Sequence, residues 1–388
     1  MKKICNFRPL CWLAFVVILA IASAMISAWC TLIVGLIVFS VLLWSRLPRQ
    51  FKFIAMMLYL VAIVSYLLTT CYVANPYYRT YDPDAGLRGV ILRYVRWYLS
   101  LFLSPENADL VYVMLLGDKS VLSYGLRFDF TVSGLAHILV VSGLHVGALY
   151  GALGSILRWC RVPQRAHLWI IAPVLLFYGY LCGWQYAIIR AVIMSLIYSL
   201  AKHHLRIADS LSVMSLAVVV ILIIYPYALV SASFLLSFAC VLGYNLWYRK
   251  IYQVIPSKSF AMYVSVTLGS FPFLVYYFGT ATLLGVVANV ILVPLLMCAF
   301  YAGRFTVCTF ACGAILWLVE PLLNFVRWIT GAIGQIPWAT LPLNHGLPAI
   351  FVYLAAMLLL SRFVFLRPKI KYPIVAMLFT CYLILLVV

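Results

Sequence analysis

Long apolar runs recur along the whole chain, separated by short segments that carry lysine and arginine. Most runs are about 20 residues long, which is the length an α-helix needs to cross a hydrocarbon core of about 30 Å. The pattern therefore predicts an all-α, polytopic transmembrane helical bundle of about 11–13 spans. The predicted spans are 10–28, 30–46, 53–73, 131–157, 167–182, 187–201, 210–226, 228–248, 260–279, 283–303, 305–319, 347–361 and 373–388.

Two of these runs have an ambiguous shape. The first, Leu10 to Trp44, is apolar for much longer than the core of a cleaved signal peptide, which has about 7–15 residues. We therefore expect a helical hairpin that turns near Ser27–Thr31. The second, Leu135–Trp159, is glycine-rich and is consistent with either one continuous span or a broken, re-entrant element.

Composition excludes a soluble protein. Of the 388 residues, 67% are hydrophobic and 9% are charged, whereas soluble domains carry about 25% charged residues. A chain with so few polar side chains could not cover its surface in water. The 11 cysteines include no C-x-x-C pair, so neither a disulfide framework nor a structural zinc site is expected.

The net charge of +19 mainly encodes orientation, because lysine and arginine concentrate in the cytoplasmic loops of membrane proteins. A cytoplasmic N-terminus makes most basic residues fall in alternate loops and places the C-terminus outside. In this map Arg190 is the single basic residue within a span. The basic clusters assigned to the cytoplasm are Lys2/Lys3/Arg8, Arg46/Arg49/Lys52, Arg158/Arg161/Arg165, Lys202/Arg206, Arg249/Lys250/Lys258, Arg304 and Arg362/Arg367/Lys369/Lys371.

The alternation of loops gives four segments. Residues 1–75 form N-terminal transmembrane helices, 76–130 an extracytoplasmic segment, 131–303 a core and 304–388 the C-terminal transmembrane helices. The extracytoplasmic segment holds six of the eight acidic residues, which are Asp82, Asp84, Glu106, Asp109, Asp118 and Asp129.

Two stretches outside the predicted spans have the pattern of helices that lie in the membrane interface. In Gly86–Leu103, Arg88, Arg93 and Arg96 share one arc of the helix and apolar side chains occupy the rest. In Glu320–Gly334, polar residues recur at helical spacing opposite two aromatic residues. The polar residues are Asn324, Arg327, Gly331 and Gln335, the aromatic ones are Phe325 and Trp328, and Pro337 and Pro342 end the pattern.

The richest polar cluster within an apolar run is Ser133–Gly147, which contains His137, Ser142, Gly143 and His145. Polar groups at membrane depth usually face a cavity or one another. The serines and histidines are consistent with either a functional path or hydrogen bonds between packed helices. Glycine at 143 and 147 permits close helix contact or a break in the helix.

Two further polar residues lie within spans. Arg190 lies near the outer end of its span, where its side chain would either extend to the membrane surface or pair with a phosphate, which suits its planar guanidinium. Asn289 lies near the middle of its span, and Pro294 is expected to kink that helix and free backbone carbonyls.

Motifs of enzymes are missing from the sequence. There is no H-E-x-x-H and no phosphate-binding G-x-x-x-x-G-K-[ST]. Ser142 and His145 mimic a serine–histidine pair, but they are three residues apart and no acidic residue orients the histidine. The sequence therefore predicts no enzyme and no cofactor or metal, with a hydrolase that uses Ser142 as the least favoured reading.

The polar motifs carry a family resemblance. The stretch Leu115–Ser120, with Gly117 and Asp118 as a structural turn, precedes His-Ile-Leu-Val-Val-Ser-Gly-Leu-His at 137–145. This order resembles the ComEC-type competence proteins, in which a Gly-Asp turn precedes His-Leu-Leu-Ala-Ile-Ser-Gly-Leu-His. Similar stretches follow in the same order over about residues 105–300, namely Arg190–Met194, Ser233–Phe238 and Ala288-Asn289 with Pro294.

The resemblance implies an inner-membrane channel that conducts single-stranded DNA into the cytoplasm. His137, Ser142, Gly143, His145, Arg190 and Asn289 would then line or shape the path, and Arg88, Arg93 and Arg96 would either anchor their helix or guide DNA. Membrane lipid, an extracytoplasmic DNA receptor and a cytoplasmic ATPase or helicase are the implied partners.

The chain departs from the family pattern in three ways. Residues 76–130 are too short for the OB-like domain that many members have, no His-x-His-x-Asp-His of a nuclease domain occurs, and Leu235 replaces a common glutamine. A separate nuclease or OB-like protein is therefore expected. A transporter or flippase for a small anionic or lipid substrate is the alternative function.

Overall fold

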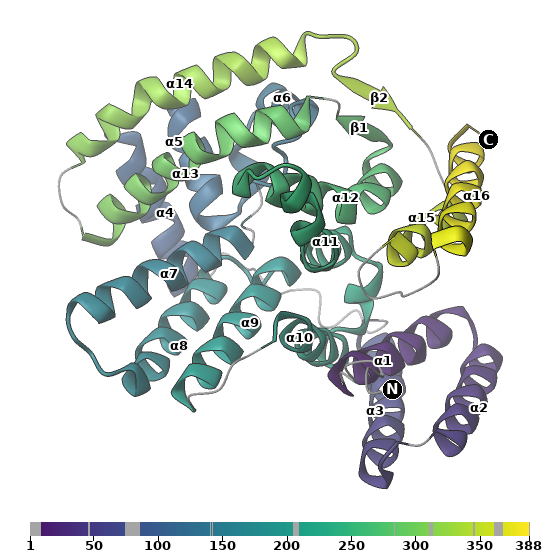
Figure 1. Cartoon of the computed structure of the whole chain (residues 1–388). Coiled ribbons are helices and arrows are strands. Elements are labelled where there is room, and N and C mark those ends of the chain that lie inside the picture. Colours follow the sequence, from purple (N-terminus) through teal and green to yellow (C-terminus); the bar gives the residue numbers. More distant parts are fainter. Residues whose placement is uncertain are drawn as a thin grey trace. The chain divides into compact units, whose positions relative to one another are not determined.

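The computed structural model describes residues 9–387 apart from 46, 74–85, 140, 142, 205–208, 283, 310–312, 344–345 and 361–367. Within these residues the chain forms helices α1 to α16, two short 3₁₀ helices and one two-stranded sheet (Figure 1). The predicted all-α bundle is confirmed, and the small sheet is the only β-structure in the described part of the chain. Two compact units can be distinguished: Met1–Pro83 with Val146–Leu235, and Asp84–His145 with Leu236–Val388.

The first unit begins with the predicted N-terminal hairpin, which is confirmed. α1 ends at Ile26 and α2 begins at Ala28, and the Ser27 hydroxyl between them accepts a hydrogen bond from the Cys30 amide at 3.1 Å. α1 packs against α2, α3 and α10, and α9 packs against α8 and α10. The helices are α1 Pro9–Ile26, α2 Ala28–Trp44, α3 Arg49–Val73, α7 Gly143–Trp159, α8 Gln164–Leu181, α9 Tyr186–His203, α10 Ser210–Ile224 and the 3₁₀ helix η3 Pro226–Val230.

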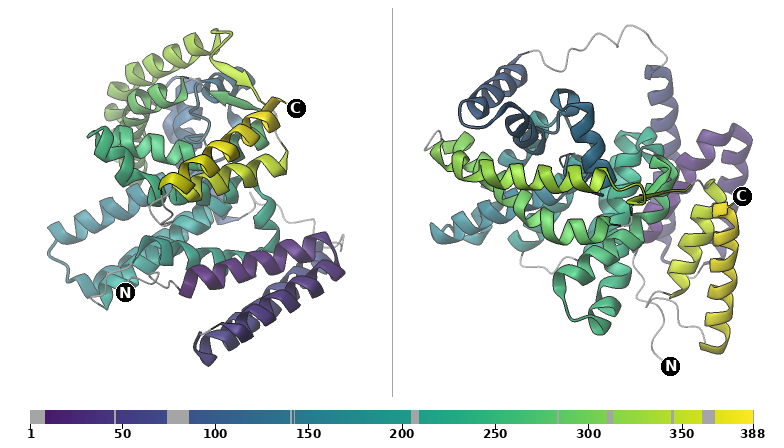
Figure 2. Two further views of the ribbon diagram at one scale, coloured as in Figure 1. Left: turned by 45° about the vertical axis from the view of Figure 1, so that its right-hand side comes forward. Right: turned by 90° about the horizontal axis from the view of Figure 1, so that it is seen from above.

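The second unit contains the predicted extracytoplasmic helices and the C-terminal half. α14 packs along α13 and against α6 and α5, and α13 and α14 run side by side in the views of Figures 1 and 2. The elements are α4 Leu87–Ser100, α5 Pro105–Leu116, the 3₁₀ helix η2 Lys119–Val121, α6 Tyr124–Val132, α11 Ala232–Val254, α12 Lys258–Phe278, β1 Thr280–Thr282, α13 Gly285–Thr309, α14 Ala314–Gly334, β2 Thr340–Pro342, α15 Leu347–Leu360 and α16 Pro368–Val387.

The short strands β1 and β2 join the two connections that follow α12 and α14. They pair antiparallel, with Ala281 opposite Leu341. Each strand has only three residues, so the alternation of polar and apolar positions was too short to predict it.

Four helical segments in the described residues are long and apolar enough to cross a membrane, namely Pro9–Ile26, Arg49–Cys71, Lys258–Phe278 and Val287–Val307. Four shorter apolar segments accompany them, at Ala28–Trp44, Ser210–Ile224, Pro348–Leu360 and Pro373–Tyr382. These segments coincide with predicted spans. The number of actual crossings, predicted as 11–13, stays a prediction.

Two predicted spans take a different form. The span 131–157 is divided, because α6 ends at Val132 and α7 begins at Gly143, so the broken alternative is the correct one. The span 305–319 is wrong: α13 continues to Thr309, and α14 begins at Ala314 and runs on through the predicted interfacial stretch. No proline lies near 303–306, so nothing there removes a helical hydrogen bond and α13 extends through Gly303.

The longer α13 also changes the place of Arg304. A Cβ atom added at the neighbouring Gly303 would lie 2.6 Å from Cγ1 of Val111, so α13 touches α5 at this point. Residues in contact cannot lie on opposite sides of a hydrocarbon core of about 30 Å. A cytoplasmic Arg304 and a wholly extracytoplasmic segment 76–130 therefore do not fit together, and the side of the membrane on which each lies stays a prediction.

Candidate functional site

The motif region begins with a tight turn at Gly134, directly after α6. Gly134 has φ +74°, in the left-handed region that favours glycine. A Cβ atom at this position would lie 2.8 Å from the Cα of Gly285 and 3.0 Å from Oγ1 of Thr282. Any larger residue would therefore separate the turn from the start of α13.

Asn289, one turn into α13, ties the same turn to the helix. Its Nδ2 donates hydrogen bonds to the carbonyl oxygens of Gly285 at 2.6 Å and Gly134 at 3.3 Å. The Gly134 carbonyl also lies 3.2 Å from Nδ1 of His137, whose side chain is exposed. The structure thus brings together two of the predicted residues, Asn289 and His137, on one carbonyl group.

His145, in the first turn of α7, makes an aromatic contact with Phe300 of α13. It is 0% exposed, and its ring centroid is 4.6 Å from that of Phe300 in an edge-on arrangement. The guanidinium carbon of Arg304 lies 5.1 Å from the centroid of the same Phe300 ring, in cation–π geometry. His145 and Arg304 therefore both contact the ring of Phe300.

Arg304 is a residue that the sequence analysis assigned to a loop. It belongs to α13 and to the candidate membrane-crossing segment Val287–Val307. Arg304 therefore joins Arg190 as an arginine within a candidate span, which the sequence map had not predicted. The signal that could have found Arg304 is the uninterrupted apolar pattern on both sides of it.

The other motif residues take different positions. Gly143 is the first residue of α7, where the helix is interrupted, and Ser142 lies outside the described residues. A Cβ atom at Gly147 would meet nothing within 4 Å, so no close helix contact forms there. Of the two roles considered for these glycines, Gly143 fits the break and Gly147 fits neither.

Arg190 belongs to the first unit. It lies in the first turns of α9, is 7% exposed, and donates from Nη1 to Sδ of Met194 at 3.9 Å. A side chain that extended to the membrane surface would be more exposed than this. The burial of Arg190 favours an interior role over the surface alternative.

The turn at Gly117-Asp118 ends α5. Gly117 has φ +83° and donates its amide to the Val113 carbonyl at 2.8 Å. The Asp118 carboxylate accepts from the Ser120 amide at 3.0 Å and from its hydroxyl at 2.7 Å. These bonds give local hydrogen-bond partners to backbone groups at the end of α5 and at the start of η2.

Of the three arginines predicted to share a helix face, Arg96 has a partner on the next helix. Its Nη2 lies 3.1 Å from Oδ1 of Asp109 on α5. Arg93 is exposed, as are the apolar Val90 and Trp97 beside it. An exposed face that mixes arginine with tryptophan suits the membrane interface, where both residue types are common.

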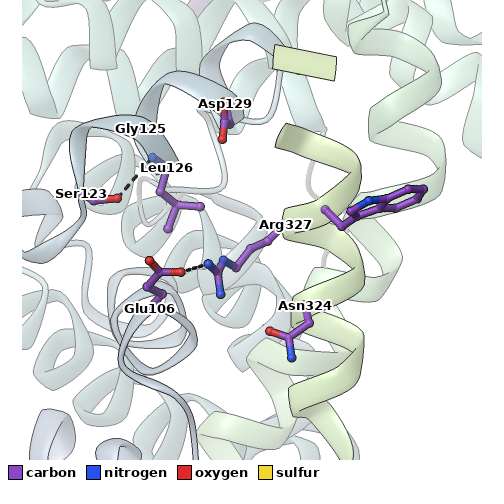
Figure 3. A pocket seen from close by; sticks show the side chains of 8 residues that line it. Glu106, Ser123, Gly125, Leu126, Asp129, Asn324 and Arg327 are labelled. Atoms are coloured by element: carbon purple, nitrogen blue, oxygen red, sulfur yellow. Dashed lines mark hydrogen bonds and ion pairs between the residues drawn. The ribbon is translucent and has the colours of Figure 1, made fainter. Parts of the chain in front are cut away.

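A second polar site lies between α5, α6 and α14, and sequence analysis did not find it. Figure 3 shows that Arg327 of α14 points to Glu106 of α5 and forms an ion pair with it. Nη1 of Arg327 also donates to Oδ1 of the buried Asn107 at 3.3 Å, and Nδ2 of Asn107 donates to Oδ1 of Asn324 at 2.8 Å. The polar face of α14 is therefore turned toward the protein.

This polar face borders a cavity of about 500 Å³. Asp129 of α6 lines it together with Glu106, Asn324, Arg327 and Trp328. Burial raises the pKa of the Asp129 carboxyl above its usual value. The sequence had separated these residues into two outer-face segments and gave no sign that they share one cavity.

The candidate site thus offers hydrogen-bonding groups, arginines and aromatic rings. In the described part of the chain, no cluster of three histidine, cysteine or carboxylate side chains could hold a metal ion. Arg304 and the side-chain amide of Asn289 make the motif region, rather than the carboxylate-lined cavity, suited to contact with a polar or anionic chain.

Comparison with known proteins identifies the family. The Competence protein family matches residues 114–369, about two thirds of the chain. The chain is 30% identical to ComE operon protein 3 of Bacillus subtilis (strain 168) over 202 residues, which are 51% of this chain and 26% of that protein. It is 27% identical to Competence protein ComA of Neisseria gonorrhoeae over 283 residues, 68% of this chain and 40% of that protein. No solved structure matches it.

The chain spans less than half the length of either relative. The family match nevertheless contains the whole motif from Gly134 to Gly147 as well as Arg190, Asn289 and Arg304, and it extends past the region of resemblance seen in the sequence. The chain therefore belongs to the competence protein family.

Proposed function

We propose that this protein conducts single-stranded DNA across the cytoplasmic membrane, and that the motif region with α13 forms part of the path. The observation that carries the proposal is the family match over residues 114–369, which includes every polar residue assigned to the path. The path residues are His137, Ser142, Gly143, His145, Arg190 and Asn289, to which Arg304 is added.

The physical argument concerns the charge of the strand. A phosphate backbone in a lipid-embedded path needs cations or water, because unpaired ions at this depth cost several kcal/mol. Arg304 in the second unit and Arg190 in the first are arginines within largely apolar helices. Non-helical backbone such as residues 133–139 is tolerated at membrane depth where it is buried in protein or lines a water-filled cavity.

We assign no covalent chemistry to the chain. Passage of DNA would be driven by other proteins, with an extracytoplasmic DNA receptor and a cytoplasmic ATPase or helicase as partners. A separate protein would supply the nuclease or OB-like function. Both curated relatives extend well beyond the region that this chain matches, so these partner assignments are proposals.

Uptake of labelled DNA tests the function. In the organism that makes this chain, deletion of its gene should abolish the entry of label into a nuclease-resistant cytoplasmic pool, and a plasmid copy should restore it. Gly143→Leu and His145→Ala should both fail to restore uptake at membrane levels that immunoblotting shows to be normal. The first places a bulky side chain at the helix break, and the second removes the ring that contacts Phe300.

The same strains separate the two function classes. Normal DNA uptake in the deletion strain, together with loss of transport of a small anion or of lipid scrambling, would support the transporter or flippase and overturn the channel. Loss of DNA uptake with unchanged lipid scrambling supports the channel.

A further inference from the structure

The surface of α14 has the opposite polarity to that of a helix in water. Its exposed residues recur at helical spacing and include Trp317, Leu318 (78% exposed), Phe325 and Trp328 (69% exposed). Its polar Arg327, in contrast, is turned to α5. Apolar and aromatic side chains on the outside are typical of a helix in contact with lipid, and tryptophan concentrates at the depth of the lipid headgroups.

The cavity behind this helix carries an unbalanced negative charge. Arg327 is already paired with Glu106, which leaves the carboxylate of Asp129. Within the described part of the chain no hydrogen bond or ion pair engages that carboxylate, and Figure 3 shows it apart from the Arg327–Glu106 pair. In a protein of net charge +19, a cavity with two carboxylates and one guanidinium selects a cation and disfavours a phosphate.

Glycines on α14 leave the space that this carboxylate occupies. A Cβ atom at Gly334 would lie 2.5 Å from Oδ1 of Asp129, and one at Gly331 would lie 3.7 Å from Oδ2. This close approach keeps the Asp129 carboxylate at the wall of the cavity. The lining residues of α6 and α14 supply no cation that pairs with it.

The side chains that line the cavity limit the kinds of cation that it can bind. Among the described residues, the cavity has two carboxylates, one of which is already paired with Arg327, and no group of three histidine, cysteine or carboxylate side chains that could hold a metal ion. An ammonium group has three donors, and the cavity offers acceptors on Asp129, Glu106 and Asn324. Trp328 borders the cavity from the exposed stripe of α14, where its indole can pack against the lipid that carries the ammonium group.

We propose that this cavity binds the ammonium headgroup of phosphatidylethanolamine, with the acyl chains lying along the exposed apolar stripe of α14. The cavity of about 500 Å³ is of the size that accepts a small organic group. The site is separate from the proposed DNA path and does not depend on it. It would hold α5, α6 and α14 together at the membrane surface.

Lipid binding to the purified full chain tests the proposal. The protein in detergent is titrated with phosphatidylethanolamine and, separately, with phosphatidylglycerol, and bound lipid is counted by native mass spectrometry. We expect tighter binding of phosphatidylethanolamine. Asp129→Asn, which keeps the shape of the side chain and removes its charge, should weaken this binding about tenfold or more.

Two controls make the result specific. Asp209→Asn should leave binding unchanged, because Asp209 caps α10 in the first unit and asparagine caps a helix equally well. Trp328→Leu should weaken phosphatidylethanolamine binding while leaving the melting temperature unchanged, since the ring is largely exposed. This second variant keeps the test valid if Asp129→Asn is poorly folded.

Several outcomes would overturn the proposal. Equal affinity for the two lipids would show that the ammonium group is not recognised. Unchanged binding in folded Asp129→Asn would remove the cavity from the interaction. Free phosphoethanolamine that binds as tightly as the lipid would assign the cavity to a soluble ammonium compound instead. Because the readout is lipid binding, it is independent of DNA uptake.

Discussion

Two glycines of the same motif lie in very different surroundings. Gly134 has a positive φ and touches the backbone of Gly285, whereas Gly147 is a helical residue with open space at its Cβ position. Sequence analysis gave Gly147 the roles of a close helix contact or a helix break and assigned no separate role to Gly134. The difference lies in what surrounds each residue, and it can be measured.

Gly134→Ala is expected to destabilise the protein by about 2–4 kcal/mol, because alanine is disfavoured in the left-handed region and its methyl group would overlap Gly285. Gly147→Ala is the matched control and should leave stability unchanged or slightly raised, since alanine favours a helix. Thermal melting of the two purified variants in the same detergent measures the difference. Equal melting temperatures would contradict the contact between the turn and α13.

Arg304 is expected to matter for uptake through its charge. Arg304→Lys keeps a cation near Phe300 and should retain most DNA uptake, whereas Arg304→Gln should lose it. The reason is that successive phosphates of a moving strand have no fixed register with the guanidinium. At Arg190, likewise, the lysine variant should retain most uptake and the glutamine variant should lose it. Uptake is measured at equal membrane abundance, and loss in both variants would instead indicate one anion held by two parallel hydrogen bonds.

Asp129 provides a pH dependence for the proposed lipid site. Burial raises the pKa of its carboxyl above the ordinary value of about 3.9, and the charged groups that face it across the cavity are Glu106 and Arg327. Ammonium binding requires the carboxylate, so binding should be full above this pKa and should fall as pH decreases through it. Lipid titrations at several pH values check this, and Asp129→Asn should abolish the pH dependence.

At the scale of elements, close helix contacts in the second unit are made by glycines. A Cβ atom at Gly269 of α12 would lie 2.4 Å from the Ala239 carbonyl oxygen and 2.7 Å from the Cα of Gly243 on α11. Small residues at such positions let helix backbones approach closely, and the resulting van der Waals packing is one of the forces that associate helices in lipid. The apolar pattern of α11 and α12 does not by itself predict that these two helices pack against each other.

Gly269→Ala is therefore expected to separate α11 from α12 and to cost about 1–3 kcal/mol, the usual range for an overpacked contact. Gly151→Ala on α7 is the matched control, because its Cβ position is open. Limited proteolysis of the two variants in membranes measures the loosening. Equal resistance in both would show that α11 and α12 tolerate the added methyl group.

At the scale of the whole molecule, the contact between Gly303 and Val111 constrains membrane topology. A cysteine placed at Tyr124, which is exposed on α6, and one placed at Thr309, near the end of α13, should react with an impermeant thiol reagent from the same side. Ser257, which caps α12, is predicted to be cytoplasmic and should react from the other side. Labelling is compared with the unaltered chain, whose own cysteines give the background.

Labelling of Tyr124→Cys and Thr309→Cys from opposite sides would contradict the packing of α13 on α5. It would also restore the cytoplasmic position of Arg304 that the basic clusters predicted. Labelling of Ser257→Cys from the same side as Tyr124→Cys would overturn the orientation derived from lysine and arginine.

The sequence by itself determined that the chain is a bundle of apolar helices and where most of them begin and end, because lipid requires every backbone group to bond within its own helix. It also located the motif of the competence family. Only the tertiary structure decided that α13 extends through Arg304, that His145 meets this residue across Phe300, and that Asp129, Glu106 and Arg327 share one cavity. These contacts join residues far apart in the chain through side-chain packing, which periodicity along one helix does not encode.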